Sequence, residues 1–222
     1  MKPSSKNRLL PRHQELFPGS SLFDRIARAV CRAGTLPRKE LFEAWEMAKR
    51  VRRRYRGGRV LDLACGHGLL AHILLILDNS SPKALAADCR IPANALKLSQ
   101  SLIRTWPGLE GRVAFMERPI RDIEVLPGDL VVSAHACGLL TEEVLEKAAA
   151  SRARVAVLPC CQDAGRSPTA GLENWTGKSL AVDIARAFWL QSKGYQTIAG
   201  KIPSAVTPKN RLLMGEWVKP GH

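Results

Sequence analysis

The stretch Val60-Leu61-Asp62-Leu63-Ala64-Cys65-Gly66-His67-Gly68 decides the fold of this chain. Its apolar start predicts a short buried strand, and the apolar run that follows, residues 69–77, predicts a helix. The two glycines between them predict a turn, because glycine adopts backbone conformations barred to other residues and lets the backbone approach a ligand closely. The stretch therefore reads as strand, glycine turn and helix, with a ligand site at the turn.

Strands and helices alternate on the C-terminal side of this stretch, which predicts a parallel sheet with helices on both faces. Ligands of such sheets bind beyond the carboxyl ends of the strands. A long helix and two last strands, separated by a loop with Pro203, predict an antiparallel hairpin at the end of the sheet. The predicted strands are 60–64, 84–87, 113–117, 130–134, 154–158, 195–202 and 211–218, and the predicted helices are 69–77, 93–105, 141–151 (with Thr141 as its N-cap) and 178–193.

The N-terminal quarter has a different pattern. Residues 1–12 are polar and basic, and we expect them to be disordered. Apolar residues at helical spacing then predict two helices, 20–33 and 37–55, before Gly57-Gly58 interrupts the chain. We therefore divide the chain into a basic helical extension, residues 1–56, and an α/β domain, residues 57–222.

The positive charge is concentrated in this extension. Residues 1–59 carry 16 Lys and Arg against 5 Asp and Glu, out of 34 and 20 in the whole chain. The densest part runs from Lys49 to Arg56. A basic extension on a nearly neutral domain predicts a polyanionic partner, most simply RNA, although a solvated helix that only aids solubility has the same pattern.

Composition bears on the compartment of the protein. The start of the chain lacks the apolar stretch of an export signal, and the longest apolar run is far shorter than the ~20 residues that span a bilayer. None of the six cysteines forms a C-x-x-C pair, and a chain of 222 residues needs no disulfides to fold. We expect reduced thiols, a cytoplasmic location and no membrane partner.

Two carboxylates frame the glycine turn in the sequence. Asp88 ends the second predicted strand, where an acid can accept hydrogen bonds from both ribose hydroxyls of a nucleoside cofactor. Asp62 lies four positions before Gly66. The glycines also fit the dinucleotide pattern G-x-G-x-x-A, but an acid at the position of Asp62 disfavours a pyrophosphate and suits a cofactor with a cationic amino group and a sulfonium.

The stretch resembles motif I, D-x-G-x-G-x-G, of class I S-adenosylmethionine-dependent methyltransferases, with Ala64 in place of the first glycine. The resemblance implies a Rossmann-like fold with a mostly parallel seven-stranded sheet ending in an antiparallel hairpin, and S-adenosylmethionine as cofactor. The residues that it assigns to the methionine side are Asp62, Ala64, Gly66 and Gly68, with Asp88 on the ribose and Ile120 and Arg121 beside the adenine.

The fourth and fifth predicted strands end in Ser133-Ala134-His135-Ala136-Cys137-Gly138 and Leu158-Pro159-Cys160-Cys161. This pair resembles a branch of methyltransferase domains with H-x-C-G and P-C-C motifs. The branch includes the tRNA 2′-O-methyltransferase of the acceptor stem and the glutathione S-transferase C-terminal-domain-containing protein. The resemblance covers residues 57–222 and implies that these strand ends border the transferred methyl group.

Five roles are open for the residues at these two strand ends. His135 is a candidate general base because its pKa lies near neutrality, or it only shapes the pocket. Cys137 or Cys160 is a candidate nucleophile of the kind that activates cytosine, although the D-A-P-C motif of such enzymes is absent. A zinc site would use His135, Cys137, Cys160 and Cys161, but adjacent cysteines rarely share one zinc, so no metal is assigned. The thiols can also simply fill space.

The sequence thus predicts a methyltransferase that moves a methyl group from S-adenosylmethionine to a nucleoside in tRNA or rRNA. One alternative is a methyltransferase that acts on a small molecule or a protein side chain. The other is a non-catalytic RNA-binding module on the same fold.

Overall fold

The protein, seen here in a computed structural model that describes residues 2–159 and 167–218, is built on one mixed sheet of seven strands in the order β3-β2-β1-β4-β5-β7-β6. Strands β1 to β5 pair in parallel, and β7 pairs antiparallel with both β5 and β6. The predicted sheet with its terminal antiparallel hairpin is confirmed. The strands are β1 (Val60–Leu63), β2 (Ala84–Asp88), β3 (Val113–Glu117), β4 (Leu130–Ser133), β5 (Arg154–Val157), β6 (Tyr195–Lys201) and β7 (Arg211–Trp217).

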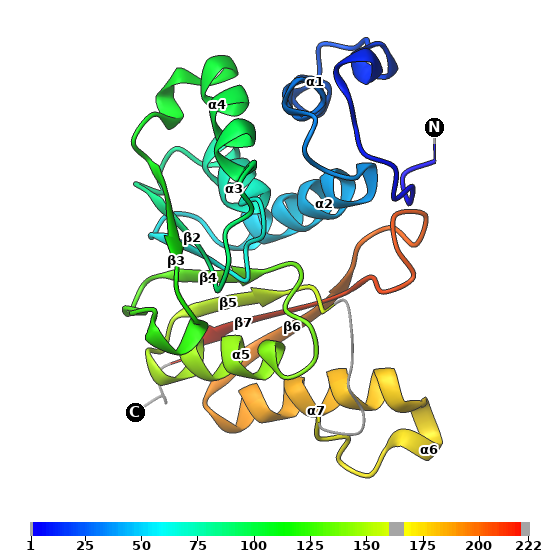
Figure 1. Cartoon of the computed structure of the whole chain (residues 1–222). Coiled ribbons are helices and arrows are strands. Elements are labelled where there is room, and N and C mark those ends of the chain that lie inside the picture. The colour runs from blue at the N-terminus through cyan, green and yellow to red at the C-terminus, as the bar shows by residue number, and fades with distance from the viewer. Residues whose placement is uncertain (1, 160–166, 219–222) are drawn as a thin grey trace.

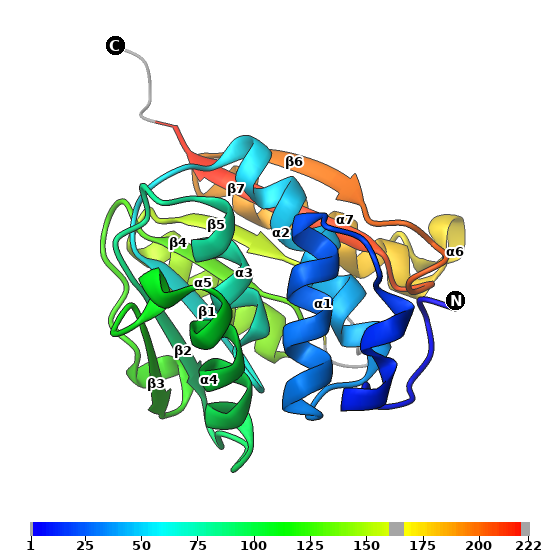
Figure 2. The same ribbon diagram turned by 90° about the horizontal axis from the view of Figure 1, so that it is seen from above.

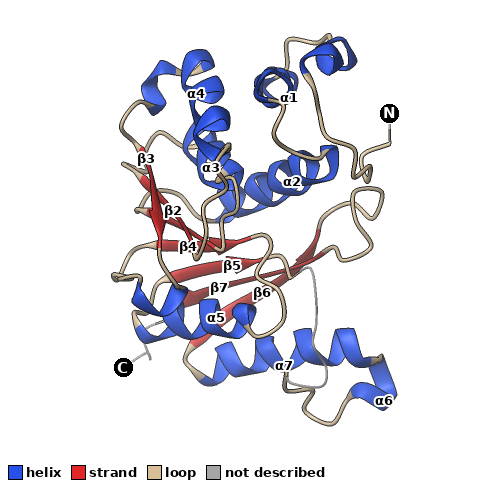
Figure 3. Cartoon of the chain, viewed as in Figure 1, coloured by secondary structure: helices blue, strands red, loops and turns tan. Residues whose placement is uncertain are grey.

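Helices cover both faces of this sheet (Figures 1 and 3). Helices α1 to α4 lie on one face, and α5 and α7 lie on the other. The chain order of the strands reverses between β1 and β4, so the carboxyl ends of these two strands form the switch point at which such sheets bind ligands. The helices are α1 (Leu22–Ala33), α2 (Arg38–Arg54), α3 (Leu69–Leu77), α4 (Ala95–Thr105), α5 (Leu140–Ala150), α6 (Glu173–Thr176) and α7 (Lys178–Ser192), with short 3-10 helices η1 (Pro11–Leu16), η2 (Pro107–Leu109) and η3 (Ile120–Asp122).

The strands are buried on both faces, which explains their continuous apolar sequences. In β1, Val60 packs into the core under α1 to α4, whereas Leu61 and Leu63 pack into the core with α5. Asp62 lies between them and is 2% exposed. Since side chains alternate along a strand, Asp62 points to the same face as Val60, toward α3.

Helix ends follow the expected local chemistry, with one correction. Ser21 caps α1 by accepting a hydrogen bond from the Asp24 amide, and Gly34 ends that helix at φ 66°. The sequence predicts Thr141 as the N-cap of α5, and this prediction is wrong, because the N-cap is Leu139. Thr141 lies inside the helix, fully buried, where its hydroxyl donates to the Ala136 carbonyl at 2.8 Å. Its hydroxyl thus serves the turn before the helix.

The expectation that residues 1–12 are disordered is wrong for the described residues 2–12. The Leu9 amide donates to the Leu36 carbonyl at 2.8 Å, and the Arg38 amide donates to the Asn7 carbonyl at 3.0 Å. Leu9 is fully buried. One apolar side chain and a pair of backbone hydrogen bonds therefore attach a segment whose composition suggests mobility.

Helices α1 and α2 share a continuous apolar core with α3, α4 and the sheet. Met47 and Val51 of α2, both fully buried, belong to this core. The extension and the α/β domain therefore pack against each other, and their division between residues 56 and 57 remains a prediction. Within the described residues, no helix has both the length and the apolarity needed to cross a bilayer.

Candidate active site

The glycine turn between β1 and α3 has the left-handed backbone that its sequence predicts. Ala64 has φ 55°, Gly66 has φ 52° and Gly68 has φ 70°. Ala64 is therefore strained, because a left-handed conformation costs an L-residue roughly 1–2 kcal/mol. The motif it resembles has glycine at this position, so the turn keeps the glycine geometry without the glycine.

The two remaining glycines serve different purposes. A Cβ on Gly66 would meet no atom within 4 Å, so the backbone there faces open space. A Cβ on Gly68 would lie 2.8 Å from the ring of Phe115 and 3.2 Å from the Cβ of Ala86. Gly68 thus lets helix α3 pack closely on the sheet, whereas Gly66 leaves room for a ligand.

The two predicted carboxylates hold this turn in place. Asp62 accepts a hydrogen bond from the Ala71 amide at 3.1 Å, in the first turn of α3. Burial raises the pKa of Asp62 well above its usual value, and the nearby Asp88 adds to the effect. Asp88 accepts a hydrogen bond from the Gly66 amide at 2.9 Å. Both acids therefore lie at the turn, where the sequence predicts them.

A pocket opens between this turn, the end of β4 and the N-terminal half of α2. Asp62, Ala64 and His67 line it from the turn, and His135 lines it from the end of β4. Sequence reasoning missed the contribution of α2, because the spacing of a helix does not reveal which surface it packs on. The residues that close the pocket from this side are Leu36, Glu40 and Ala44.

Helix α2 also places a buried carboxylate beside His135. Glu43 Oε2 lies 3.9 Å from His135 Nε2, and Lys39 Nζ contacts Glu43 Oε1 at 2.6 Å. Glu43 Oε2 is buried and has no hydrogen-bond partner among the described residues. Crowding by protein atoms lowers the pKa of His135, although 38% of its side chain is exposed, while Glu43 raises that pKa and Lys39 lowers it.

His67 is a further titratable side chain of the pocket that the sequence did not single out. Its Nε2 lies 2.8 Å from Asn94 Oδ1, at the start of α4. Burial lowers the pKa of His67, partly offset by this hydrogen bond, and the charge of Arg8 lowers it further. The ring is therefore biased to the neutral form and ties the glycine turn to helix α4.

Of the three cysteines predicted at the ends of the fourth and fifth strands, only Cys137 lies within the described residues. Cys137 is exposed in the turn after β4. Cys160 and Cys161 lie outside the described residues. Among the residues that are described, no group of three or more His, Cys, Asp or Glu side chains is arranged to hold a metal ion.

The two residues predicted beside the adenine lie in η3. Ile120 is 6% exposed and packs into the core with α5, whereas the side chain of Arg121 is 76% exposed. Neither lines the pocket at the glycine turn. Their role in cofactor binding remains a prediction.

Comparison with known proteins assigns the chain to a family. A family model described as a methyltransferase domain matches residues 40–166, more than half of the chain. The chain belongs to this family. Membership supports a methyltransferase with S-adenosylmethionine as its cofactor, as the sequence predicts. The narrower branch with H-x-C-G and P-C-C motifs, and its tRNA 2′-O-methyltransferase, stays a prediction.

Solved structures share the fold at low sequence identity. An O-methyltransferase family protein from Burkholderia thailandensis matches with a TM-score of 0.56 and 18% identity, over 98% of this chain and 66% of that chain. A ribosomal protein L11 methylase from Lactobacillus delbrueckii subsp. bulgaricus has a TM-score of 0.50 and 13% identity, over 80% and 77%. Human N-acetylserotonin methyltransferase, in complex with S-adenosylmethionine, matches with a TM-score of 0.50 and 15% identity, over 90% of this chain and 57% of that chain. No curated protein sequence matches this chain.

The chemistry of the turn and of the adjoining pocket fits this cofactor. The backbone at Gly66 faces open space beside the carboxylate of Asp88, and Asp62 and Glu40 place acidic groups on the adjoining pocket. Burial and the neighbouring Glu43 raise the pKa of Glu40. A cationic ligand would relieve this crowding of carboxyl groups, whereas a pyrophosphate would add to it.

Proposed function

We propose that the protein transfers a methyl group from S-adenosylmethionine to a nucleoside in RNA, either tRNA or rRNA. The observation that carries the first half is the open backbone at Gly66, framed by Asp62 and Asp88. The bound cofactor supplies an activated methyl group, so the protein mainly has to position the acceptor and remove its proton.

The chain's residues would divide the cofactor between them. Asp62, Ala64, Gly66 and Gly68 would border the methionine part. Asp88, whose carboxylate already holds the Gly66 amide, would accept from the ribose hydroxyls. We keep Ile120 and Arg121 as the residues beside the adenine; they lie in η3, which follows β3, and the last residue of β3, Glu117, pairs with Asp88.

His135 is our candidate base. It follows β4 at the edge of the pocket, and its imidazole can accept the proton of an acceptor hydroxyl near neutral pH. Cys137 and Cys160 remain candidates for a thiolate nucleophile. The exposed position of Cys137 is compatible with a reacting group and equally with an ordinary surface thiol.

The RNA acceptor rests on charge. The excess of basic over acidic residues in residues 1–59 supports a polyanionic substrate, since phosphate contacts provide most of the affinity for nucleic acids. A cytoplasmic location is supported by the free thiols of Cys31, Cys65, Cys89 and Cys137.

Calorimetry tests the cofactor. Titration with S-adenosylmethionine and with its demethylated product should show binding to the wild type and at least tenfold weaker binding to a variant that fills the space at Gly66. No heat of binding for either compound would refute the methyltransferase. That result would favour a non-catalytic RNA-binding module on this fold.

Mass spectrometry of nucleosides tests the acceptor. Total RNA from cells with and without the gene should differ in one methylated nucleoside, which the purified protein should restore with labelled cofactor. An unchanged nucleoside profile, together with methylation of a small molecule or a protein, would favour a methyltransferase that acts on such a substrate instead of RNA. That alternative also predicts activity independent of salt.

A further inference from the structure

The densest basic segment of the sequence, Lys49 to Arg56, is largely neutralised in the folded protein. Arg52 is 2% exposed, and its guanidinium donates to the Leu74 carbonyl and to Ser81 Oγ. Only Arg53 of this segment is exposed without a described ion pair. The pairs are Lys49 and Arg50 with Glu46, Arg52 and Arg56 with Asp78, and Arg54 with Glu216.

A second basic group has no such compensation. We call Arg25, Arg28 and Arg32 of α1, together with Arg104 of α4, the arginine ridge. Within the described residues, none of the four has a carboxylate oxygen within 4.0 Å. Three of them, Arg25, Arg32 and Arg104, are exposed. In the sequence they are spread out, so their density appears only after folding.

The packing of α1 against α4 brings the ridge together (Figures 1 and 2). Ser101 Oγ of α4 donates to the Ala29 carbonyl of α1 at 2.7 Å, and Arg32 donates to Thr105 Oγ1 at 2.6 Å. Arg25 lies over the ring of Trp106, 5.1 Å from its centroid. These contacts fix the two outer arginines of α1 against the end of α4.

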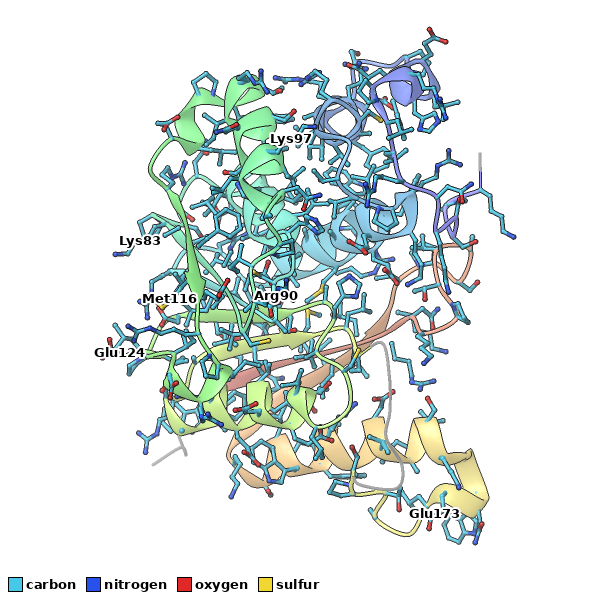
Figure 4. All side chains as sticks on the ribbon, in the orientation of Figure 1. Lys83, Arg90, Lys97, Met116, Glu124 and Glu173 are labelled. Atoms are coloured by element: carbon cyan, nitrogen blue, oxygen red, sulfur yellow. The ribbon has the colours of Figure 1, made fainter. Side chains whose placement is uncertain are left out.

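Mutual repulsion is evident on the ridge. Burial, and then the charges of Arg104 and Arg28, lower the pKa of Arg32. The two helices carry five basic side chains and a single acid, Asp24, whose carboxylate is engaged by Ser21 at the helix start. The fifth basic residue, Lys97, lies between the ribbons of α4 and α1 in the view of Figure 4. Anions that bound here would relieve this repulsion.

Both helices of the ridge lead directly to the pocket. Leu36, two residues after the Gly34 that ends α1, lines it. At the start of α4, Asn94 holds His67 of the glycine turn. A polymer bound along α1 and α4 would therefore lie on two helices that each adjoin, at one end, the pocket that we assign to the methyl donor.

We propose that the arginine ridge, and not the segment Lys49 to Arg56, binds the phosphate backbone of the RNA substrate. The inference rests on the proposed function for the identity of the polymer. Arg25 and Arg32 are seven residues apart, which is about 10.5 Å along a helix. That length spans about three phosphates of one strand at duplex spacing.

Two matched triple variants test the proposal. The ridge variant combines Arg25→Gln, Arg32→Gln and Arg104→Gln. The control combines Arg53→Gln, Arg54→Gln and Arg56→Gln, which removes the same charge from the exposed part of the dense segment. Fluorescence anisotropy with a labelled RNA hairpin of mixed sequence measures affinity at several salt concentrations, and thermal unfolding confirms that each variant folds.

The ridge variant should bind RNA at least tenfold more weakly, and the salt dependence of its affinity should flatten by about 2–3 logarithmic units per decade of salt. The control should stay within about threefold of the wild type. Arg→Lys at the three ridge positions should restore most of the affinity, because a phosphate contact needs the charge and not the guanidinium shape. Equal losses in both triple variants, or none in the ridge variant, would overturn the proposal.

Other polyanions and the cofactor separate the remaining outcomes. Vesicles with anionic lipid or polyglutamate that compete as well as RNA, charge for charge, would overturn RNA as the occupant. S-adenosylmethionine affinity should be unchanged in the ridge variant. If the wild type binds RNA but not S-adenosylmethionine, the methyltransferase function is refuted, whereas the proposal that the ridge binds RNA stands. If the ridge variant binds RNA with wild-type affinity and still methylates it, the role of the ridge is refuted and the proposed function stands.

Discussion

Glu43 Oε2 of helix α2 lies 3.9 Å from His135 Nε2, at the mouth of the pocket between α2 and the end of β4. The carboxylate is 3% exposed and takes one contact from Lys39 on its other oxygen. A buried anion at this distance favours the protonated imidazole, and the cation behind it opposes that effect. Burial has the largest effect on the pKa of His135 and lowers it, and these two residues, one helical turn apart, shift that pKa in opposite directions.

Removing either partner should shift the pKa of His135, in opposite directions. Glu43→Gln removes the charge that raises the pKa of His135, so the imidazole should titrate at a lower pH than in the wild type. Lys39→Gln removes a charge that lowers it, so the imidazole should titrate at a higher pH. NMR of the histidine ring nitrogens measures both shifts. Shifts of the same sign in the two variants would contradict this electrostatic account.

Gly66 and Gly68 should respond differently to alanine. Both have left-handed backbones, so the strain added by a Cβ is similar, roughly 1–2 kcal/mol. Gly66→Ala should lose little more stability than this but at least tenfold in S-adenosylmethionine affinity, because its Cβ would occupy the open space. Gly68→Ala should unfold more easily, since its Cβ meets Phe115. Urea unfolding and calorimetry compare the two, and equal effects on both measurements would contradict the division of roles.

Ala64→Gly should stabilise the protein. The left-handed conformation at φ 55° costs alanine roughly 1–2 kcal/mol in the folded protein, and glycine removes this strain. The greater conformational freedom of glycine in the unfolded chain reduces the gain in stability by about 0.4–1 kcal/mol. The net gain should be about 0.5–1 kcal/mol in the free energy of urea unfolding. A loss of stability would show that the Ala64 methyl packs favourably enough to outweigh its strain.

The sequence predicted the sheet, its terminal hairpin and the glycine turn, because these depend on local patterns. A buried strand, two glycines and an apolar helix follow one another from Val60 to Leu77, and each is recognisable from its own residues. Asp62 and Asp88 could be placed for the same reason, since parallel strands end at one edge of the sheet.

The contribution of helix α2 to the pocket could not be predicted in this way. Glu40 and Glu43 lie in a helix whose charges look like a solvated face, and only the tertiary packing buries Glu43. The attachment of Leu9 to Leu36 was hidden for the same reason. Charge density along the sequence was equally uninformative, because Arg52 is buried, whereas Arg25 and Arg32, two turns apart on α1, are exposed.

His72 should make the protein less stable as the pH falls below about 6.5. Its ring is fully buried, with Nδ1 2.7 Å from the Gly68 carbonyl and Nε2 3.0 Å from Ser99 Oγ. The carbonyl can only accept, so Nδ1 carries a proton, and burial disfavours a second proton on Nε2. Burial lowers the pKa of His72 to about 4, so below pH 6.5 the unfolded chain binds a proton that the folded protein refuses.

The consequence is a loss of about 2 kcal/mol in the free energy of unfolding between pH 7 and pH 5 that depends on His72. Urea unfolding at several pH values, for the wild type and for His72→Gln, isolates this part because glutamine does not titrate. The wild type should lose its advantage over the variant as the pH falls. A constant difference between them across this range would mean that His72 is protonated equally in both states.

Arg52→Gln should be far more damaging than the same change at its exposed neighbour Arg53. Arg52 lies 3.1 Å from Asp78, whose pKa falls to about 2 because hydrogen bonds from Ser80 and Gly57 and the charge of Arg52 outweigh its burial. Removing one member of a buried ion pair costs about 3–5 kcal/mol, since the other charge stays buried. Arg53→Gln should stay within about 0.5 kcal/mol of the wild type. Equal stabilities of the two variants in urea would show that Arg52 is not the structural member of the basic segment, and that its charge is available for RNA after all.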